Sequence, residues 1–401
     1  MRRFWAFLAV AGTLLAQRAP LETAWDLAAK GQTAKAVALL EELTGKEPRN
    51  GEARLLLGSL LASMGKAPES LKQLQAAVRL LPNSAEAHDA LGEAYHAALD
   101  IDHARPEFEL AVKLSPNLAQ AQSNLGMALG ELGELPAAAQ HLDRAIKLLG
   151  SNPDAVVPHF LRAKVYTQEG LAEKAAAELA LALKLRPDLA AAWSDLGQAR
   201  KAQQDDVGAF AAFEHAATLD PRDASAQARL GAEYLHRGQP HEAVQHLQQA
   251  ISVDATDQTA LFNLQRALHQ DSREAEARAV SKQLAEIIAR KDEQMQNHLT
   301  ANRLNNEGVK LQQTGDLKGA LPKYSAAHEL NPESGLFRFN MAVALLRVGR
   351  WKEGLAELHT CMDLEPDNTK LKAVWDDAIR QAPPGSWTGD GTAPSRVQAH
   401  Q

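Results

Sequence analysis

The chain has 401 residues, of which 45% are hydrophobic but only 5% are aromatic. It can therefore bury a large core built mainly from alanine and leucine, the strongest helix formers. Its net charge of −7 lacks the excess of lysine and arginine that binding to nucleic acid or anionic lipid usually requires, so no nucleic-acid partner is expected.

The N-terminus predicts an export signal. Arg2 and Arg3 precede an uncharged apolar run, Phe4–Ala16. A membrane-spanning helix needs roughly 20 apolar residues, and this shorter run is typical of the apolar core of a signal peptide. We expect residues 1–16 to be cleaved after Ala16. The mature chain would then be periplasmic or secreted, with no membrane insertion. The alternative is a first helix that packs on the remaining fold.

Proline recurs every 34 residues within three groups: Pro48, Pro82 and Pro116; Pro187 and Pro221; Pro332 and Pro366. This period defines ten units, here called repeats one to ten: 17–50, 51–84, 85–118, 119–152, 156–189, 190–223, 224–257, 258–291, 301–334 and 335–368. Residues 153–155 and 292–300 interrupt them. A fixed period of this length is typical of a repeat architecture.

Other positions align in the same frame. Position 20 is small in all ten repeats: Ala36, Ser70, Ala104, Ala138, Ala175, Ala209, Ala243, Ala277, Ala320 and Gly354. Position 8 is small in nine of the ten, with only Gln265 departing. Position 27 is mostly alanine and includes Cys361, the single cysteine, which is therefore predicted to be a small core residue. Small residues at these positions allow helix backbones to approach closely.

Glycine at position 15 of most repeats predicts a left-handed turn that ends a helix. Proline at position 32 ends the next helix because it cannot continue one. Each repeat is therefore predicted to be two helices of about 13 residues that must stack on their neighbours to bury their apolar faces.

These columns resemble the tetratricopeptide repeat. The fullest match lies in residues 192–221, where the signature spacing is occupied by Trp193, Leu196, Gly197, Ala209, Phe213 and Pro221. Arg200 departs where the family often has tyrosine. The resemblance covers nearly all of the chain after residue 16. It implies an all-α fold, an α-solenoid in which antiparallel helix pairs form a right-handed superhelix.

In this family the first helices line a concave groove, and asparagine at position 6 often bonds the backbone of a bound peptide. The resemblance therefore implies a site for a peptide or protein partner. Its candidate residues lie at positions 5, 6 and 9: Asn124, Phe160, Lys164, Gln198, Arg229, Asn263, Arg266, Asn305, Asn306, Phe339 and Asn340. An asparagine amide can both donate and accept a hydrogen bond. The alternative is that these asparagines are solvated residues of an exposed face.

Residues 273–299 contain neither glycine nor proline, and their apolar residues recur at helical spacing. We expect residues 292–300 to be a helical spacer that extends the second helix of repeat eight. The spacer would separate an eight-repeat array, 17–291, from two further repeats, 301–368. Whether one helix continues to residue 313 stays open, and a coiled-coil pairing competes with the spacer interpretation.

The C-terminal residues predict a cap and a tail. Residues 369–381 place Leu371, Val374, Trp375 and Ala378 on one face, as expected of a helix that caps the array. Residues 382–401 are rich in proline, glycine and serine, which predicts disorder.

No motif predicts catalysis, a metal or a cofactor. His241 and His246 flank Glu242, but histidines five apart diverge by about 140° on a helix, whereas a zinc protease needs them four apart. We therefore predict a non-enzymatic exported scaffold that binds a partner in the groove. The alternative is a structural or assembly subunit of an envelope complex for secretion, pili or polysaccharide export, acting through self-association or its convex face. The oligomeric state is left open.

Overall fold

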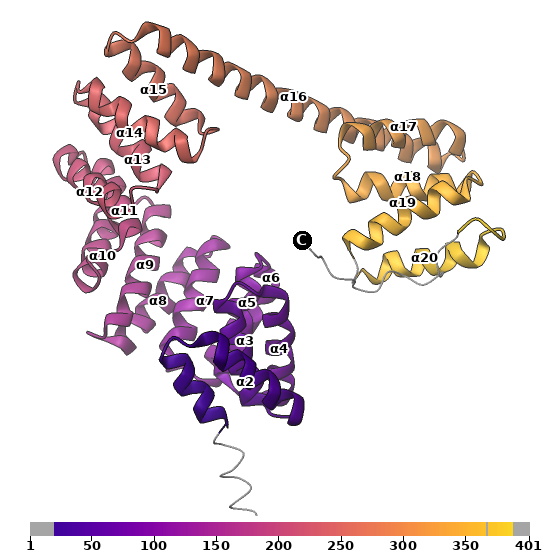
Figure 1. Cartoon of the computed structure of the whole chain (residues 1–401), viewed down its shortest axis with the longest axis horizontal. Helices are drawn as coiled ribbons and strands as arrows, with labels where there is room; N and C mark the ends of the chain where they lie inside the picture. The colour runs from indigo at the N-terminus through magenta and orange to yellow at the C-terminus, as the bar shows by residue number, and fades with distance from the viewer. Residues whose placement is uncertain (1–19, 366–367, 388–401) are drawn as a thin grey trace, which may run out of the picture. The chain divides into compact units, whose positions relative to one another are not determined.

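The computed structural model describes residues 20–365 and 368–387. The described residues form helices and turns without any strand, and consecutive helices pack side by side in antiparallel pairs (Figure 1). The all-α solenoid is therefore confirmed. The expected signal peptide at residues 1–16 and the expected tail from residue 388 onward lie outside the described residues.

The chain divides into two compact units, one ending at Asp271 and one beginning at Ser272. In the first unit, residues 20–29 are helical. They are followed by α2 (Thr33–Lys46), α3 (Gly51–Ser63), α4 (Ala67–Leu80), α5 (Ala85–Ala97), α6 (Ile101–Leu114), α7 (Ala119–Glu131), α8 (Leu135–Leu149), the 3₁₀ helix η1 (Pro153–Ala155), α9 (Val156–Gln168), α10 (Ala172–Leu185), α11 (Ala190–Ala202), α12 (Asp206–Leu219), α13 (Ala224–His236), α14 (Pro240–Val253) and α15 (Gln258–Gln270).

The second unit begins with α16 (Glu274–Gln313), a single helix of 40 residues that Figure 1 shows without a break. The helices after it are α17 (Leu317–Leu330), α18 (Gly335–Arg347), α19 (Trp351–Leu364) and α20 (Thr369–Gln381). The first helix of repeat nine is thus the C-terminal part of α16. Among the described residues, no helix has both the length and the apolar character needed to cross a bilayer.

The ends of the helices follow from single residues at fixed positions. A polar residue at position 34 caps the next helix by accepting a hydrogen bond from its first backbone N–H groups, at Asn50, Ser84, Asp223, Asp257, Ser334 and Asn368. Position 15 adopts a positive φ in the turn between the two helices, even in the three repeats where Leu99, Gln204 and Ser272 replace glycine.

Close approach at positions 8 and 20 builds the core of each repeat. The Ser70 hydroxyl at position 20 donates to the carbonyl of Gly58 at position 8, 2.8 Å away. Position 8 also faces the large residue at position 24, since a Cβ added to Gly197 would lie 2.5 Å from the Phe213 ring. Cys361 is buried, as predicted. Burial raises the pKa of its thiol to about 11, which suits a packing role.

Position 4 carries a polar contact that joins consecutive repeats. Its side chain bonds the carbonyl of the proline that ends the previous repeat, at Arg54, His88, Gln122, Trp193, Gln227 and Arg338. Five of these residues also bond position 23 of their own repeat, as in the 2.6 Å contact between His88 and Glu107. These bonds connect the end of one repeat to the first helix of the next at six repeat boundaries.

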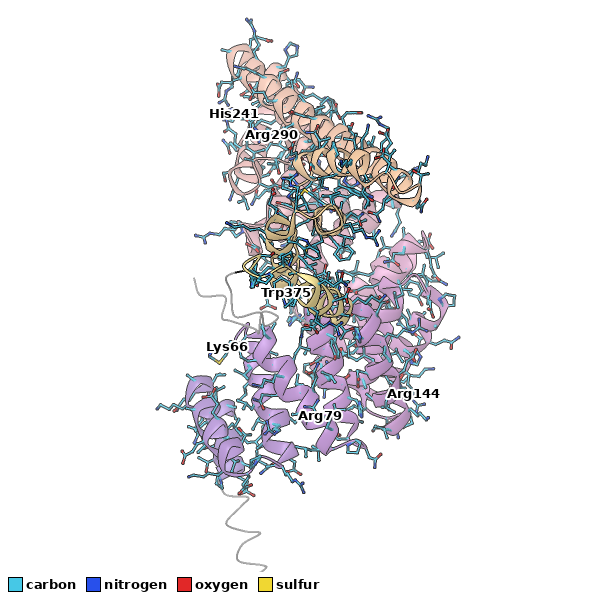
Figure 2. The ribbon with its side chains drawn as sticks, turned by 90° about the vertical axis from the view of Figure 1, so that its right-hand side faces the viewer. Lys66, Arg79, Arg144, His241, Arg290 and Trp375 are labelled. Carbon is cyan, nitrogen blue, oxygen red and sulfur yellow. The ribbon has the colours of Figure 1, made fainter. Side chains whose placement is uncertain are left out.

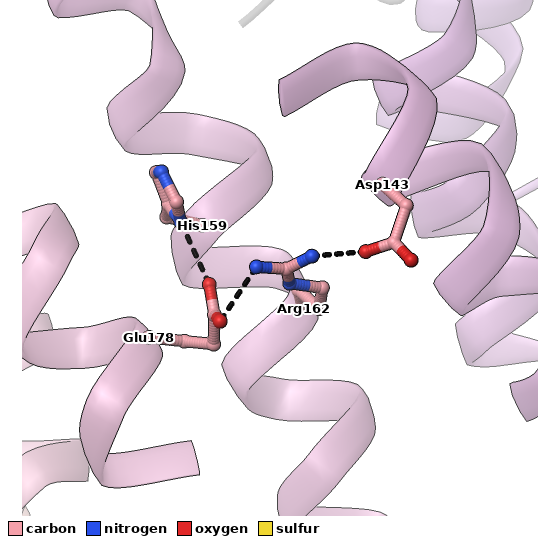
Figure 3. Close-up of polar contacts among 4 residues, drawn as sticks. All are labelled: Asp143, His159, Arg162 and Glu178. Carbon is pink, nitrogen blue, oxygen red and sulfur yellow. Dashed lines mark hydrogen bonds and ion pairs between the residues drawn. The ribbon is translucent and has the colours of Figure 1, made fainter. Parts of the chain in front are cut away.

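The three-residue interruption at 153–155 forms η1, and an ionic network that is partly buried joins the helices on either side of it (Figure 3). Glu178 of α10 accepts from His159 at 2.7 Å and from Arg162 at 2.6 Å, both in α9. Arg162 also donates to Asp143 of α8. The pKa of Glu178 is lowered because the bonds from His159 and Arg162 outweigh its burial.

The packed C-terminal region extends beyond α20. The centre of the Trp387 ring lies 5.2 Å from the centre of the Trp375 ring and 5.2 Å from the centre of the His359 ring. Trp375 is fully buried on α20, where Figure 2 labels it. Residues 382–387 were expected to belong to a disordered tail, but the apolar ring of Trp387 gives them a surface to pack on. The tail expectation does not hold for these six residues.

Candidate functional site

The candidate groove residues fall into two groups. Seven lie in the first unit, on α7, α9, α11, α13 and α15: Asn124, Phe160, Lys164, Gln198, Arg229, Asn263 and Arg266. Four lie in the second unit, on α16 and α18: Asn305, Asn306, Phe339 and Asn340. Each group is therefore considered as a separate surface.

Asn124 is engaged within the fold. It is buried, and its amide donates to Asp89 at 3.0 Å and to Glu93 at 2.9 Å, both on α5. Asn340 makes the same kind of contact, donating to the buried Asn305 at 2.8 Å. Position 6 thus bonds position 5 of the preceding repeat in both units. These asparagines hold first helices together and have fewer donors left for a ligand.

The Asp89 side chain is buried where it accepts the hydrogen bond from Asn124. Burial raises its pKa to about 7; the bond from Asn124 opposes that rise, and the carboxylates of Glu93 and Glu86 add to it. A carboxyl group with a higher pKa in the folded chain holds its proton more tightly there than in the unfolded chain. The folded state therefore loses stability as the pH rises from about 4 to about 7.

Asp89→Asn is expected to raise the free energy of unfolding at pH 8 by about 2–4 kcal/mol and to change it little at pH 4. The reason is that the amide keeps an acceptor for Asn124 without the buried charge. Urea unfolding at both pH values measures the difference. Asp188→Asn, in an exposed turn, is the control and should show no such pH dependence. An Asp89→Asn variant that is equally destabilised at both pH values would contradict this account.

The remaining candidates of the first unit expose cations and aromatic rings. The Lys164 ammonium lies 5.0 Å from the centre of the Phe160 ring, and the Arg266 guanidinium lies 5.8 Å from that of Phe262. Gln198 donates to Asp195 at 3.3 Å. Burial raises the pKa of Asp195, and the charges of Lys164 and Arg229 oppose that rise.

Two asparagines remain available to a ligand. Asn263 is half-buried and Asn306 is exposed, and the side-chain amide of neither has a hydrogen-bond partner among the described residues. The Arg229 guanidinium donates to the Ser225 hydroxyl of its own helix, at 3.1 Å. The first unit therefore presents apolar rings, cations and the side-chain amide of Asn263, which suit a peptide more than a small anion. Asn306 belongs to the separate surface of the second unit.

The second unit contains a defined groove between α18 and α20, with a volume of about 810 Å³. Phe339 and Asn340, both predicted from the sequence, line it together with residues that the repeat pattern did not single out: Val343, Arg347, Trp351, Val374 and Asp377. Arg347 is exposed and has no ion-pair partner among the described residues. The groove thus has an apolar floor and a cation at its rim.

The side of this groove that α20 forms was not predicted from the sequence, for an identifiable reason. Residues 373–378 belong to α20, which was assigned a capping role only, although α20 stands where the first helix of a further repeat would stand. Continuing the 34-residue frame past residue 368 places Ala373 and Val374 at positions 5 and 6. That continuation was the available signal.

The histidines considered as metal ligands have other partners. His246 bonds Gln227 at 2.8 Å and stacks on Tyr234, whereas His241 faces Asp271. Within residues 20–365 and 368–387, no three histidine, cysteine or carboxylate side chains gather in a way that could hold a metal ion.

Comparison with known proteins agrees with the repeat geometry. Family models described as tetratricopeptide repeat match residues 27–94, then 90–155 and 123–189, and finally 224–257. No protein of curated function matches the chain.

Solved structures with a similar fold include three bacterial proteins. The pilF protein of Pseudomonas aeruginosa is 18% identical over 55% of this chain and 97% of its own, with a TM-score of 0.49. A tetratricopeptide repeat protein from Parabacteroides merdae is 16% identical over 63% of this chain and 99% of its own, with a TM-score of 0.49. A thermophilic repeat protein of Thermus thermophilus is 22% identical over 46% of this chain and 98% of its own, with a TM-score of 0.38.

The helix pairs, the packing of position 8 against position 24 and the family matches lead to one conclusion. The chain belongs to the tetratricopeptide repeat family, whose fold is typical of scaffolds for protein–protein interaction.

Proposed function

We propose that this protein is an exported, non-enzymatic scaffold that holds a peptide or protein partner in the concave surface of its first helices. The observation that carries the proposal is the groove of about 810 Å³ between α18 and α20. Phe339, Val343 and Val374 supply an apolar floor for one or two partner side chains, and Arg347 can meet a carboxylate at the rim.

The first unit supports the same activity with a different surface. Phe160 and Phe262 offer rings beside the cations Lys164 and Arg266, and Asn263 can bond a peptide backbone. Export is proposed from the basic start and the short apolar run of residues 2–16. N-terminal sequencing of the protein recovered from the periplasm tests that part, with Gln17 expected as the first residue.

Partner recovery by cross-linking in the cell envelope tests the groove. Val343→Glu places a carboxylate on its apolar floor and is expected to reduce recovery about tenfold or more, a loss of at least 1.4 kcal/mol. Leu364→Glu changes a residue of α19 that is 62% exposed and does not line the groove, and it should leave recovery unchanged. Equal recovery with both variants would remove the groove from the mechanism.

A further inference from the structure

The first helices of the first unit form one continuous row. Consecutive first helices contact each other from α3 to α9 and again from α13 to α15. Between them, Lys201 of α11 donates to Glu233 of α13 at 3.0 Å, and the charge of Lys164 on α9 acts on Asp195 of α11. Because successive residues of a helix are rotated by about 100°, positions 2, 5, 6, 9, 12 and 13 of each first helix share a sector of about 120°. This sector is here called the first-helix face.

Charge on the first-helix face is divided between the two ends of the row. Helices α3, α5 and α7 place on it five carboxylates and no lysine or arginine, here called the acidic half: Glu52, Glu86, Asp89, Glu93 and Glu131. Helices α9, α11, α13 and α15 place on it four cations and one carboxylate, here called the basic half: Lys164, Lys201, Arg229, Arg266 and Asp195. The sign changes at η1, the interruption between repeats four and five.

The acidic half has no cation of its own to neutralise it. In the described part of the chain, no lysine or arginine lies within ion-pair distance of these carboxylates, and Glu131 contacts only a histidine, His96, at 2.9 Å. The charges of Glu86 and Glu93 contribute to the raised pKa of Asp89, which shows that these groups repel one another. A cation supplied by a partner would relieve this repulsion.

A buried hydroxyl on the acidic half also lacks a partner. Ser123, at position 5 of α7, is 3% exposed, and its Oγ has no hydrogen-bond partner among the described residues. Folded chains rarely leave a buried polar atom unsatisfied. A polar group of a bound segment would supply the missing hydrogen bond.

The basic half offers cations together with apolar surface. Three of its cations form no ion pair within the residues that the structure describes: Lys164, Arg229 and Arg266. Lys201, in contrast, is paired with two carboxylates. The rings of Phe160 and Phe262 lie beside two of the three unpaired cations. This half is therefore suited to carboxylates and apolar side chains of a partner.

We propose that the first-helix face binds an extended segment of a partner protein whose two ends carry opposite charge. Lysine or arginine of the segment lies against the acidic half, and aspartate or glutamate lies against the basic half. This inference rests on the proposed function and states which partner the first unit selects. Packed helices lie about 8–10 Å apart, so the row from α5 to α15 extends about 45 Å. About 14 residues of extended chain have that length.

The order of charge selects against partners that carry one sign throughout. A nucleic acid or an anionic lipid surface would be attracted to the basic half and repelled by the acidic half. A uniformly basic peptide would meet the reverse pattern. A protein segment can carry both signs in a fixed order, which matches both halves at once.

Fluorescence anisotropy with the full chain and two labelled peptides of about 14 residues tests the proposal. Both peptides contain equal numbers of lysine and glutamate among the same neutral residues. One groups the lysines in one half and the glutamates in the other, and the second alternates them. The grouped peptide is expected to bind about tenfold or more tightly than the alternating one, and the difference should shrink as salt is added. Either chain direction can match the two halves, so the result does not depend on direction.

Charge reversal on each half locates the binding. Glu86→Lys and Lys164→Glu are each expected to weaken binding of the grouped peptide about tenfold. Glu69→Lys on α4 and Lys184→Glu on α10 make the same changes at exposed positions of second helices, and these controls should bind like the unchanged chain. A peptide with lysine in place of every glutamate should bind Lys164→Glu more tightly than it binds the unchanged chain. A variant that had merely lost its fold would not gain this affinity.

Equal binding of the grouped and alternating peptides would overturn the proposal, as would a Lys164→Glu variant that binds the grouped peptide as well as Lys184→Glu does. Tighter binding of the all-lysine peptide or of single-stranded DNA by the unchanged chain would also overturn it. The outcome is separable from the test of the proposed function, because Val343 lies in the second unit. Failure here, with partner recovery still reduced by Val343→Glu, would refute this inference alone.

Discussion

Gly197→Ala is expected to lower the free energy of unfolding of repeat six by about 1–3 kcal/mol, and Gly197→Leu by more. The new Cβ would lie 2.5 Å, 2.6 Å and 2.9 Å from three carbon atoms of the Phe213 ring. This ring is buried and rigid, so relief requires the two helices of the repeat to move apart. Thermal and urea unfolding, followed by circular dichroism, measure the change.

The control for Gly197 is the same substitution at Gly130 of α7. A Cβ there would meet its nearest atom, in the side chain of Val165, at an ordinary 3.5 Å. Gly130→Ala is therefore expected to be neutral or to stabilise the chain by up to about 1 kcal/mol, since alanine favours a helix over glycine. Similar losses at Gly130 and Gly197 would contradict the close-packing explanation.

Glu178→Ala is expected to lower the free energy of unfolding by about 3–5 kcal/mol, because it leaves Arg162 and His159 buried without their shared carboxylate. Both partners lie within hydrogen-bonding distance of Glu178, and all three side chains are mostly buried. The loss should concentrate on the joint between α8, α9 and α10, which these side chains connect across the 153–155 interruption. Hydrogen exchange of the α9 amides, measured together with global unfolding, shows whether the loss of stability is concentrated at this joint.

The pH dependence of the Glu178 network has a defined sign. Because the pKa of Glu178 is lower in the folded chain than its ordinary value, its contribution to stability is present above about pH 4.5 and is lost as the pH falls through the folded value. The stability difference between the unchanged chain and Glu178→Ala should therefore shrink in acid. Glu42→Ala, which breaks an exposed ion pair with Lys46, should leave the unfolding transition in place. A Glu178 variant that behaves like this control would refute the network's role.

The sequence by itself determined the fold. A 34-residue period of small and large residues specifies which helix surfaces meet within a repeat, because Gly58, Ser70 and Leu74 must lie together wherever two helices pack that closely. Proline at position 32 and the residues at position 15 specify where each helix ends. These constraints act between residues of the same repeat. They therefore recur each time the 34-residue pattern recurs, and they can be predicted from it.

The tertiary structure alone decided which candidate groove residues are free. Asn124 and Asn263 occupy the same position of their repeats, yet Asn124 is buried against Asp89 and Glu93 while Asn263 has no such partners. The difference arises from the neighbouring repeat, whose residues 31 and 35 positions away are carboxylates in one case only. The 34-residue pattern does not predict this difference, because the carboxylates that bond Asn124 do not recur in the other repeats.

The tertiary structure also decided the shape of the groove and the joint. Val374 and Asp377 come from a terminal helix outside the repeats, and Asp143, Arg162 and Glu178 meet only because three helices converge at an interruption of the period (Figure 3). Such contacts depend on the three-dimensional proximity of residues without a regular spacing. For that reason the helix pairs could be predicted from the sequence, and the surface that would receive a partner could be predicted only in part.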